Sequence, residues 1–249
     1  MRAMLIGLFG LGFFLAGSSS LSAQDDLKLI IDKAIKAHGG EAILDKHKAS
    51  QTKTKGKLDP EGSMIEFTEE VTIHFPNKFK STSQFDFMGP HKVLVGFDGA
   101  TAWLNADGKD VSAMFDKLTD LMKEQAYILE ATRLSKLKDK NYELSSLGET
   151  KVQDKSAVGV RVASKGHNDL NLFFDKVSGL LVKVEYRTFD LNTKQEVNEE
   201  RIITEYQDKD GLKVPKKAIV NRDGKKYIEA EVLEVKHLDD IDDTQFSKP

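Results

Sequence analysis

The chain has 249 residues, of which 39% are hydrophobic and 31% are charged, and its formal net charge is −3 at pH 7. This is the composition of a globular protein with a full core, and so weak a charge disfavours nucleic-acid binding, which relies on a basic surface. The chain contains no Cys, which excludes a thiol nucleophile, disulfide bonds and a lipid anchor attached through cysteine.

The first 23 residues follow the order of a secretory signal peptide. Arg2 is followed by an apolar run from Met4 to Ala16, and small residues lead to Ala23; these are the charged, apolar and cleavage regions in sequence. The apolar run is shorter than the ~20 residues that span a membrane. We therefore predict a signal peptide over 1–23 and an exported protein over 24–249 without a transmembrane segment. We expect that protein to reside in the periplasm, or alternatively outside the cell.

Two helices are predicted to open the exported part. Apolar residues at Leu27, Ile31 and Ile35 recur at helical spacing, and Gly39-Gly40 is a helix stop signal. A second, short helix is expected from Glu41 to about Lys48.

From Ser50 to Asp107 the apolar pattern changes to a period of two, which is typical of β-strands. The segments IEFTEEVTIHF, STSQFDF and HKVLVGF each place apolar residues on one face, and turn sequences such as MGPHK and NADGK separate them. We predict consecutive antiparallel strands joined by short turns.

A long helix is predicted next, within VSAMFDKLTDLMKEQAYILEA, residues 111–131. Its apolar residues, from Val111 to Leu129, form one wide stripe on a helical wheel, and Ser112 is a plausible N-cap. Gln125 is a polar residue inside the stripe. The pattern fits a helix that covers a sheet and closes the core, and the functional alternative is a lid, near 111–137, over an apolar cavity.

A second block of strands follows the helix. The segments KSAVGVRVAS, DLNLFF, SGLLVKVEYRTF, EERIITEYQ, LKVPKKAIVN and KKYIEAEVLEV continue the two-residue period, with hairpin signals at DKDG and NRDG. In SGLLVKVEYRTF, alternation places Val182, Val184 and Tyr186 on one face. Some eleven strands in one domain predict a mainly β protein with helices (α+β), built as a curved antiparallel sheet or unclosed β-barrel.

No motif in the sequence predicts catalysis, a cofactor or a metal site. The six His residues lack zinc-binding spacing, and GxSxG, Walker A and GxGxxG sequences are missing. Asp208-Lys209-Asp210-Gly211 is interpreted as a hairpin turn, because the later ligands of a calcium loop do not follow it. Scattered carboxylates leave a hydrolase as the least favoured of the possible functions.

The order of these segments resembles the LolA-like family of outer-membrane lipoprotein-sorting proteins, in particular its uncharacterised exported members from planctomycete-type bacteria. The segments that carry the resemblance are AHGG near His38, FDKVSGLLVKVEY, DGLKVPKK and VNRDGKKYIEAEV. The resemblance implies an unclosed barrel with helices over its mouth, an apolar cavity for the acyl chains of lipoproteins, and no catalytic residues. It also implies an arginine in the cavity, for which the alternatives are Arg133, Arg161, Arg187 and Arg201.

We therefore predict a periplasmic protein that binds a lipid or a lipoprotein acyl group in the half-barrel, with an envelope protein as possible donor or acceptor. A non-catalytic envelope scaffold with a filled core is the alternative. The residues expected to line the cavity are Phe85, Phe87, Val93, Val95, Trp103, Met114, Leu118, Leu121, Met122, Gln125, Val182, Val184 and Tyr186.

Overall fold

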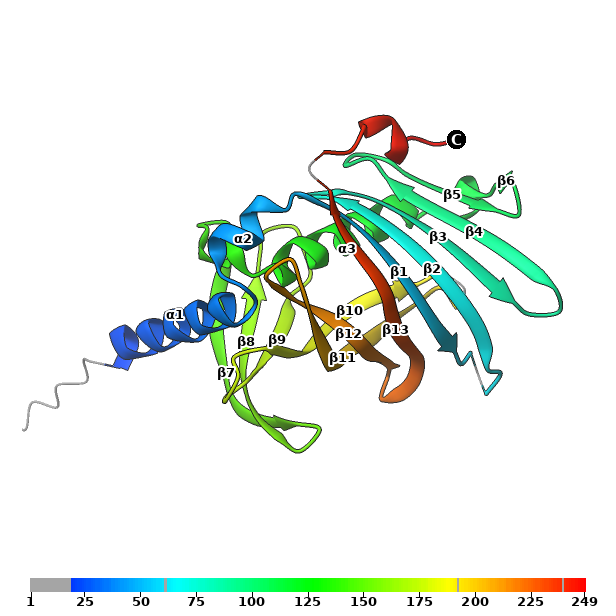
Figure 1. The fold of residues 1–249 in the computed structure, drawn as a ribbon. Coiled ribbons are helices and arrows are strands. Elements are labelled where there is room, and N and C mark those ends of the chain that lie inside the picture. Colours follow the sequence, from blue (N-terminus) through cyan, green and yellow to red (C-terminus); the bar gives the residue numbers. More distant parts are fainter. Residues whose placement is uncertain (1–18, 61, 192, 239) are drawn as a thin grey trace, which may run out of the picture.

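The strands of the protein form one antiparallel sheet, as the computed structural model shows for residues 19–60, 62–191, 193–238 and 240–249 (Figure 1). In the described residues the sheet has 13 strands. They are β1 (Ala49–Leu58), β2 (Ile65–His74), β3 (Lys78–Asp86), β4 (Pro90–Phe97), β5 (Ala102–Ala106), β6 (Lys109–Asp110), β7 (Glu143–Val152), β8 (Lys155–Ala163), β9 (Leu170–Asp175), β10 (Leu181–Asp190), β11 (Gln195–Lys209), β12 (Leu212–Arg222) and β13 (Lys225–Leu238). The helices are α1 (Ser19–Ala37), α2 (Glu41–Lys46) and α3 (Leu118–Thr132), and the 3₁₀ turns are η1 (Ser112–Met114), η2 (Ser135–Lys138) and η3 (Asp243–Phe246).

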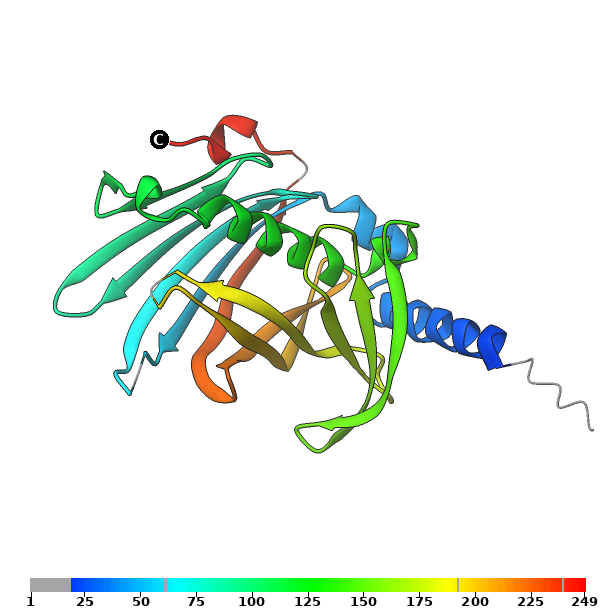
Figure 2. The same ribbon diagram turned by 180° about the vertical axis from the view of Figure 1, so that it is seen from behind.

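The order of the strands explains why a helix stands in the middle of the sequence. The order across the sheet is β6-β5-β4-β3-β2-β1-β13-β12-β11-β10-β9-β8-β7, so β6 and β7 lie at opposite edges. A flat sheet of this size would be about 58 Å wide, whereas the 15 residues of α3 extend about 22 Å. The sheet curls, and α3 lies across the curl in the segment that joins the two edges. Figure 2 shows α3 crossing the inner side of that curl.

The predicted fold class is confirmed, with more strands than expected. The additional strands are β6, which has two residues, and β7. Alternation did not reveal β7 because nearly all of its residues are exposed, so its sequence ELSSLGETKV carries no apolar row. The hairpins predicted at DKDG and NRDG connect β11 to β12 and β12 to β13, with positive φ at Asp210 and Asp223.

The first helix is longer than predicted, since α1 begins at Ser19, upstream of the cleavage site expected after Ala23. The signal peptide remains a prediction, because residues 1–18 lie outside the described part of the chain. The second helix is confirmed as α2. None of the helices in the described residues combines the length and the apolar character that crossing a membrane demands.

The central helix begins later than predicted. Residues 112–114 form the 3₁₀ turn η1, and α3 starts only at Leu118. Ser112 does not cap a helix, since its hydroxyl accepts a hydrogen bond from the Leu104 amide of β5 (2.8 Å) and donates one to Asp110 (2.5 Å). Ser112 therefore fastens this turn to the sheet.

Two apolar cores lie on the inner face, which we define as the face that α3 covers. The larger core joins α1, α2 and the second half of α3 to β8, β9 and β10. The smaller core joins the first half of α3 to β3, β4 and β5 through Leu118, Ala126, Phe79, Phe97 and Ala102. One helix thus closes both halves of the curled sheet.

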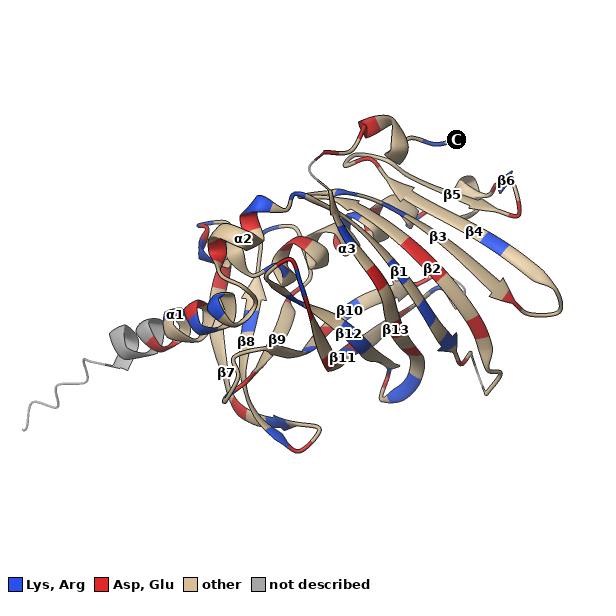
Figure 3. Ribbon diagram, in the orientation of Figure 1, with Lys and Arg blue, Asp and Glu red and all other residues tan. Residues whose placement is uncertain are grey.

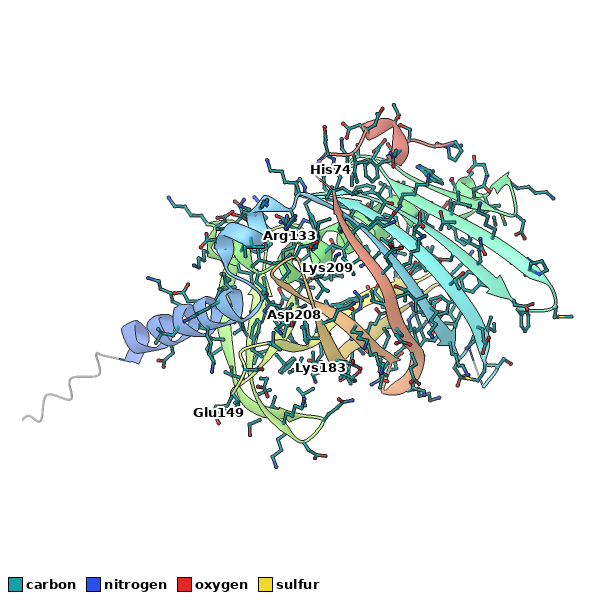
Figure 4. All side chains as sticks on the ribbon, in the orientation of Figure 1. His74, Arg133, Glu149, Lys183, Asp208 and Lys209 are labelled. Atoms are coloured by element: carbon teal, nitrogen blue, oxygen red, sulfur yellow. The ribbon has the colours of Figure 1, made fainter. Side chains whose placement is uncertain are left out.

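Arg133, labelled in Figure 4, holds α2 against the end of α3. Its guanidinium donates to the carbonyl oxygens of Leu44 and His47, the latter at 3.0 Å, and stacks on the Phe75 ring at 4.0 Å from the centroid. The side chain thereby satisfies carbonyl groups at the C-terminus of α2 that lack helical partners. Burial lowers the pKa of Arg133.

His38 ends α1 as a buried neutral ring, and this makes stability depend on pH. Its Nδ1–H donates to the Ala34 carbonyl at 2.8 Å, so Nε2 is left as an acceptor, 3.4 Å from the Leu181 amide nitrogen. Burial lowers the pKa of His38 below its ordinary value of 6.5. Below pH 6.5 the unfolded chain therefore takes up a proton on this ring that the folded protein does not.

We expect the free energy of unfolding to fall as the pH is lowered from 7.5 to 5.5, with His38 contributing up to about 1.4 kcal/mol per pH unit below its unfolded pKa. Urea unfolding of wild type and His38→Gln at both pH values measures how much His38 contributes to this fall. The variant should lose less stability on acidification than wild type, and parallel pH curves would contradict the assignment. The exposed His91 offers a variant of opposite sign: Asp107 raises the pKa of His91, so His91→Gln should make the fall on acidification steeper than in wild type.

Candidate functional site

The inner faces of β2, β3 and β4 carry a row of apolar side chains that are only half-buried. We call these residues the apolar strip: Phe67, Val71, Phe85, Val93 and Val95. The register pairs Phe67 with Phe85, and their ring centroids lie 6.1 Å apart. At one end the strip meets the buried Phe79 and Phe97 beneath α3. At the other end it reaches the turn between β3 and β4.

The first half of α3 rests directly on the end of the strip. Leu118 is 3% exposed and packs with Phe79 and Phe97, and Met122 and Leu129 also contact this core. Gln125 is half-buried and belongs to the same side of α3, because it lies three residues after Met122 and four before Leu129. The space directly beneath the helix is therefore occupied by side chains, while the strip beyond it is partly open.

Other predicted lining residues of α3 and its approach lie away from the strip. Met114 is 70% exposed in η1. Leu121 lines a separate cleft of about 180 Å³ between α3 and β10, together with Glu124 and Phe189. The structure thus brings Leu118 and Met122 to the sheet and leaves Met114 in solvent.

Val182 and Val184 lie on opposite faces, contrary to the predicted alternation. A register shift between Leu181 and Lys183 inserts one residue into β10, so Leu181, and not Val182, shares the inner face with Val184 and Tyr186. Val182 instead packs on the outer face in a core with Phe173. A β-bulge reverses the facing of all residues before it, which a constant period of two does not reveal.

Trp103 is also on the outer face. It is paired with Gly96 across β4 and β5, and a Cβ at Gly96 would lie only 2.2 Å from the Trp103 ring. The indole Nε1–H donates to the Phe246 carbonyl at 2.7 Å. Trp103 therefore anchors the C-terminal turn η3 and does not line the inner face.

A buried ionic cluster occupies the inner faces of β10, β11 and β12. Tyr186 donates to Glu199, which also accepts from Arg222 Nε at 3.1 Å, and Arg201 Nη2 donates to the Tyr186 hydroxyl at 3.0 Å. Arg222 Nη1 reaches Asp190 at 2.8 Å. Burial raises the pKa of Tyr186, which keeps the phenol neutral. Sequence reasoning identified Tyr186 and considered Arg201, but it missed Glu199 and Arg222.

Glu69 on β2 belongs to the same interior. It accepts hydrogen bonds from the hydroxyl groups of Ser81 (2.6 Å) and Ser83 (3.3 Å). The pKa of Arg201 is raised first by Tyr186 and further by the charges of Glu199 and Glu69. Glu69 and Arg201 are four strands apart, about 19 Å on a flat sheet, so this interaction reflects the curl that brings β2 and β11 toward each other. The sequence contained a signal for this position, because Glu69 is the charged residue among the alternating apolar residues of IEFTEEVTIHF.

Among the four arginines considered from the sequence, only Arg201 lies in the interior of the curled sheet. Arg133 fastens α2, Arg161 pairs with Asp169, and Arg187 pairs with Glu196 at 3.3 Å. Each of the last two pairs is largely exposed.

Two larger grooves lie along the sheet. One of about 870 Å³ crosses β11 to β4 and is lined by Phe67 and Phe85 of the apolar strip, together with charged and polar residues such as Lys55, Glu66 and Gln84. The other, of about 680 Å³, crosses β7 to β11 and is lined by Tyr186 and Glu199 together with outer-face residues such as Arg161 and Glu185. Acidic and basic residues are intermixed along these strands (Figure 3), so neither sign of charge defines a ligand there.

Comparison of the sequence with models of protein families and with curated proteins found no match. Solved structures are similar over most of the chain. A DUF1329 family protein from Desulfovibrio piger has 16% identity and a TM-score of 0.55, and the match covers 88% of this chain and 96% of that one. A LolA superfamily protein from Nitrosomonas europaea has 12% identity and a TM-score of 0.56, with 89% and 97% covered.

A putative outer membrane lipoprotein-sorting protein domain from Vibrio parahaemolyticus has 13% identity and a TM-score of 0.51, with 88% and 94% covered. At these identities the likeness concerns the arrangement of the backbone. The curled sheet, its strand order and the helix across its inner face are thus those of a LolA-like fold.

Proposed function

We propose that the protein binds the acyl chain of a lipid or lipoprotein along the apolar strip, and that it acts in the cell envelope as a binding or carrier protein without catalysis. The observation that carries this proposal is the strip itself. Five apolar side chains stay partly exposed on the inner face, where a folded protein ordinarily buries such residues.

The shape of the strip suits a linear apolar ligand. It runs from the open turn between β3 and β4 toward Phe79 and Phe97 beneath α3. Glu69, Ser81 and Ser83 lie on the same face of β2 and β3 between these ends, so the apolar path between the ends follows Val93 and Val95 of β4. Each buried methylene contributes about 0.8 kcal/mol, so an acyl chain of ~14 methylenes gains about 11 kcal/mol before the costs of ordering and association. A long chain needs more cover than the strip provides, and we infer that α3 shifts outward to admit it.

The ionic cluster gives the interior a polar boundary beside this strip. Because Glu199 is buried among Tyr186, Arg201 and Arg222, an acyl chain is disfavoured on that side. Glu69 disfavours it in the middle of β2 as well, so the chain lies mainly along β3 and β4. The head group of the ligand would then stay at the open end of the strip.

A charge placed on the strip tests the proposal. We expect Val95→Asp to weaken the binding of a fluorescent fatty-acid probe at least about tenfold, or about 1.4 kcal/mol, because the ligand would cover the new carboxylate. The measurement is a fluorescence titration at pH 7.5, with the fold of the variant verified by circular dichroism.

The control is Val177→Asp, since Val177 is 87% exposed on the turn between β9 and β10. This variant should bind like wild type. Equal affinity of folded Val95→Asp and wild type, or no probe binding by wild type, would refute the proposal. Native mass spectrometry of protein purified gently from envelopes would then identify the natural ligand through its co-purified mass.

A further inference from the structure

The turn between β3 and β4 exposes large apolar side chains. Phe87 is 47% and Met88 94% exposed, and Gly89 and Pro90 complete a run of four residues without a charge. This hairpin stands at the outer end of the sheet, clear of the helices (Figure 1). Met88 has a positive φ of 55°, a conformation that costs energy for a residue other than glycine, and its side chain is in solvent.

A second exposed methionine belongs to the same tip. Glu66 pairs with Asp86 across β2 and β3, so Met64 and Met88 each lie two residues beyond this pair on neighbouring strands. Met64 is 54% exposed. We call Met64, Phe87 and Met88 the apolar tip.

The apolar tip is continuous with the apolar strip. Phe85, the inner-face residue at the end of β3, is separated from Phe87 by one residue and contacts Phe67 on β2. An acyl chain that leaves the strip at its open end therefore meets the tip first.

We propose that the apolar tip enters the surface of a lipid bilayer, so that an acyl chain passes between the bilayer and the strip without crossing water. This inference rests on the proposed function, because an acyl chain that the strip binds has the bilayer as its source or destination. A lipid surface also suits the shape of the tip: a fluid layer can surround a convex group of flexible and aromatic side chains on all sides, without a matching pocket.

The charges around the tip limit how deeply it can enter. Glu66 on β2 and Asp86 on β3 lie two residues inside the tip, and His91 follows it on β4, where its Nδ1 lies 2.9 Å from Asp107. These groups favour the aqueous side of the interface, so only the residues of the turns reach the acyl layer. The proposed contact is therefore shallow and reversible, as release of a carrier requires.

Vesicle flotation tests this contact with the full-length exported protein. We use vesicles of phosphatidylethanolamine and phosphatidylglycerol and compare wild type with the double variant Phe87→Ser/Met88→Ser. The matched control is Met114→Ser/Val177→Ser, which removes two apolar side chains of similar exposure from η1 and from the turn between β9 and β10.

We expect wild type and the control to float with the vesicles. The vesicle-bound fraction of the tip variant should be at least about fivefold lower than that of wild type. Equal flotation of the tip variant and wild type, or no flotation of wild type, would overturn the inference. The second result would also follow if the tip instead bound a protein partner.

Titration with the soluble fatty-acid probe separates this inference from the proposed function. Without vesicles, the tip variant should bind the probe like wild type, because the strip is intact, whereas Val95→Asp should lose the probe and still float. If wild type binds no probe but its flotation depends on the tip, the proposed function fails and the bilayer contact stands.

Discussion

Glu199→Leu should lower the free energy of unfolding by about 3–5 kcal/mol, the cost typical of removing one partner from a buried ionic pair. Glu199 is 6% exposed, and it accepts hydrogen bonds from Tyr186 and Arg222 while it lies 3.5 Å from Arg201. Without its carboxylate, the guanidinium groups of Arg201 and Arg222 lie on neighbouring strands with less compensation for their charges. Urea unfolding at pH 7.5 measures the loss.

The control for this variant is Glu196→Leu on the same strand. Glu196 pairs with Arg187 at the surface, with side chains 64% and 68% exposed, and exposed pairs contribute only about 0–1 kcal/mol. A loss for Glu199→Leu as small as that for Glu196→Leu would show that the ionic cluster does not stabilise the curled sheet.

Leu118→Ala should cost about 2–5 kcal/mol, because it removes a buried side chain that joins α3 to Phe79 and Phe97 and leaves a cavity there. The same cavity would widen the space under the helix at the buried end of the apolar strip. Thermal and urea unfolding measure the change in stability.

Leu121→Ala is the matched control, because Leu121 lies three residues after Leu118 on the same helix. Leu121 is half-buried in the cleft beside β10, and its truncation should cost clearly less than that of Leu118. If the two variants are equally stable, α3 is not held to the sheet through Leu118, and its role as a cover of the strip is wrong.

The strands and turns were predictable because their signals are local. Alternating apolar residues identified β2, β3 and β4, and the DKDG and NRDG turns defined the hairpins of the C-terminal half. The same signal failed in β7, whose exposed residues form no apolar row, and in β10, where a bulge places Val182 and Val184 on opposite faces. A bulge depends on the partner strands, so a single strand does not reveal it.

The candidate site was predictable only in part. Phe85, Val93 and Val95 were chosen from alternation and lie on the inner face, whereas Trp103 was placed on the wrong face. Trp103 packs on Gly96 and holds η3, a contact between segments more than 140 residues apart. The charge of Glu69 on β2 likewise contributes to the raised pKa of Arg201 on β11, and no local pattern relates these positions.

The sequence by itself determined an antiparallel β protein with a central amphipathic helix, because the two-residue and 3.6-residue periods are properties of short segments. Only the tertiary structure decided that β1 pairs with β13, that β6 and β7 become opposite edges, and that α3 must span between them over a curled sheet. Side chains far apart in the chain therefore share the interior: a half-exposed apolar strip on β2, β3 and β4, and a buried ionic cluster facing it from β10, β11 and β12. The physical reason is that strand pairing, bulges and curvature depend on segments far apart in the chain, and together they determine which side chains meet.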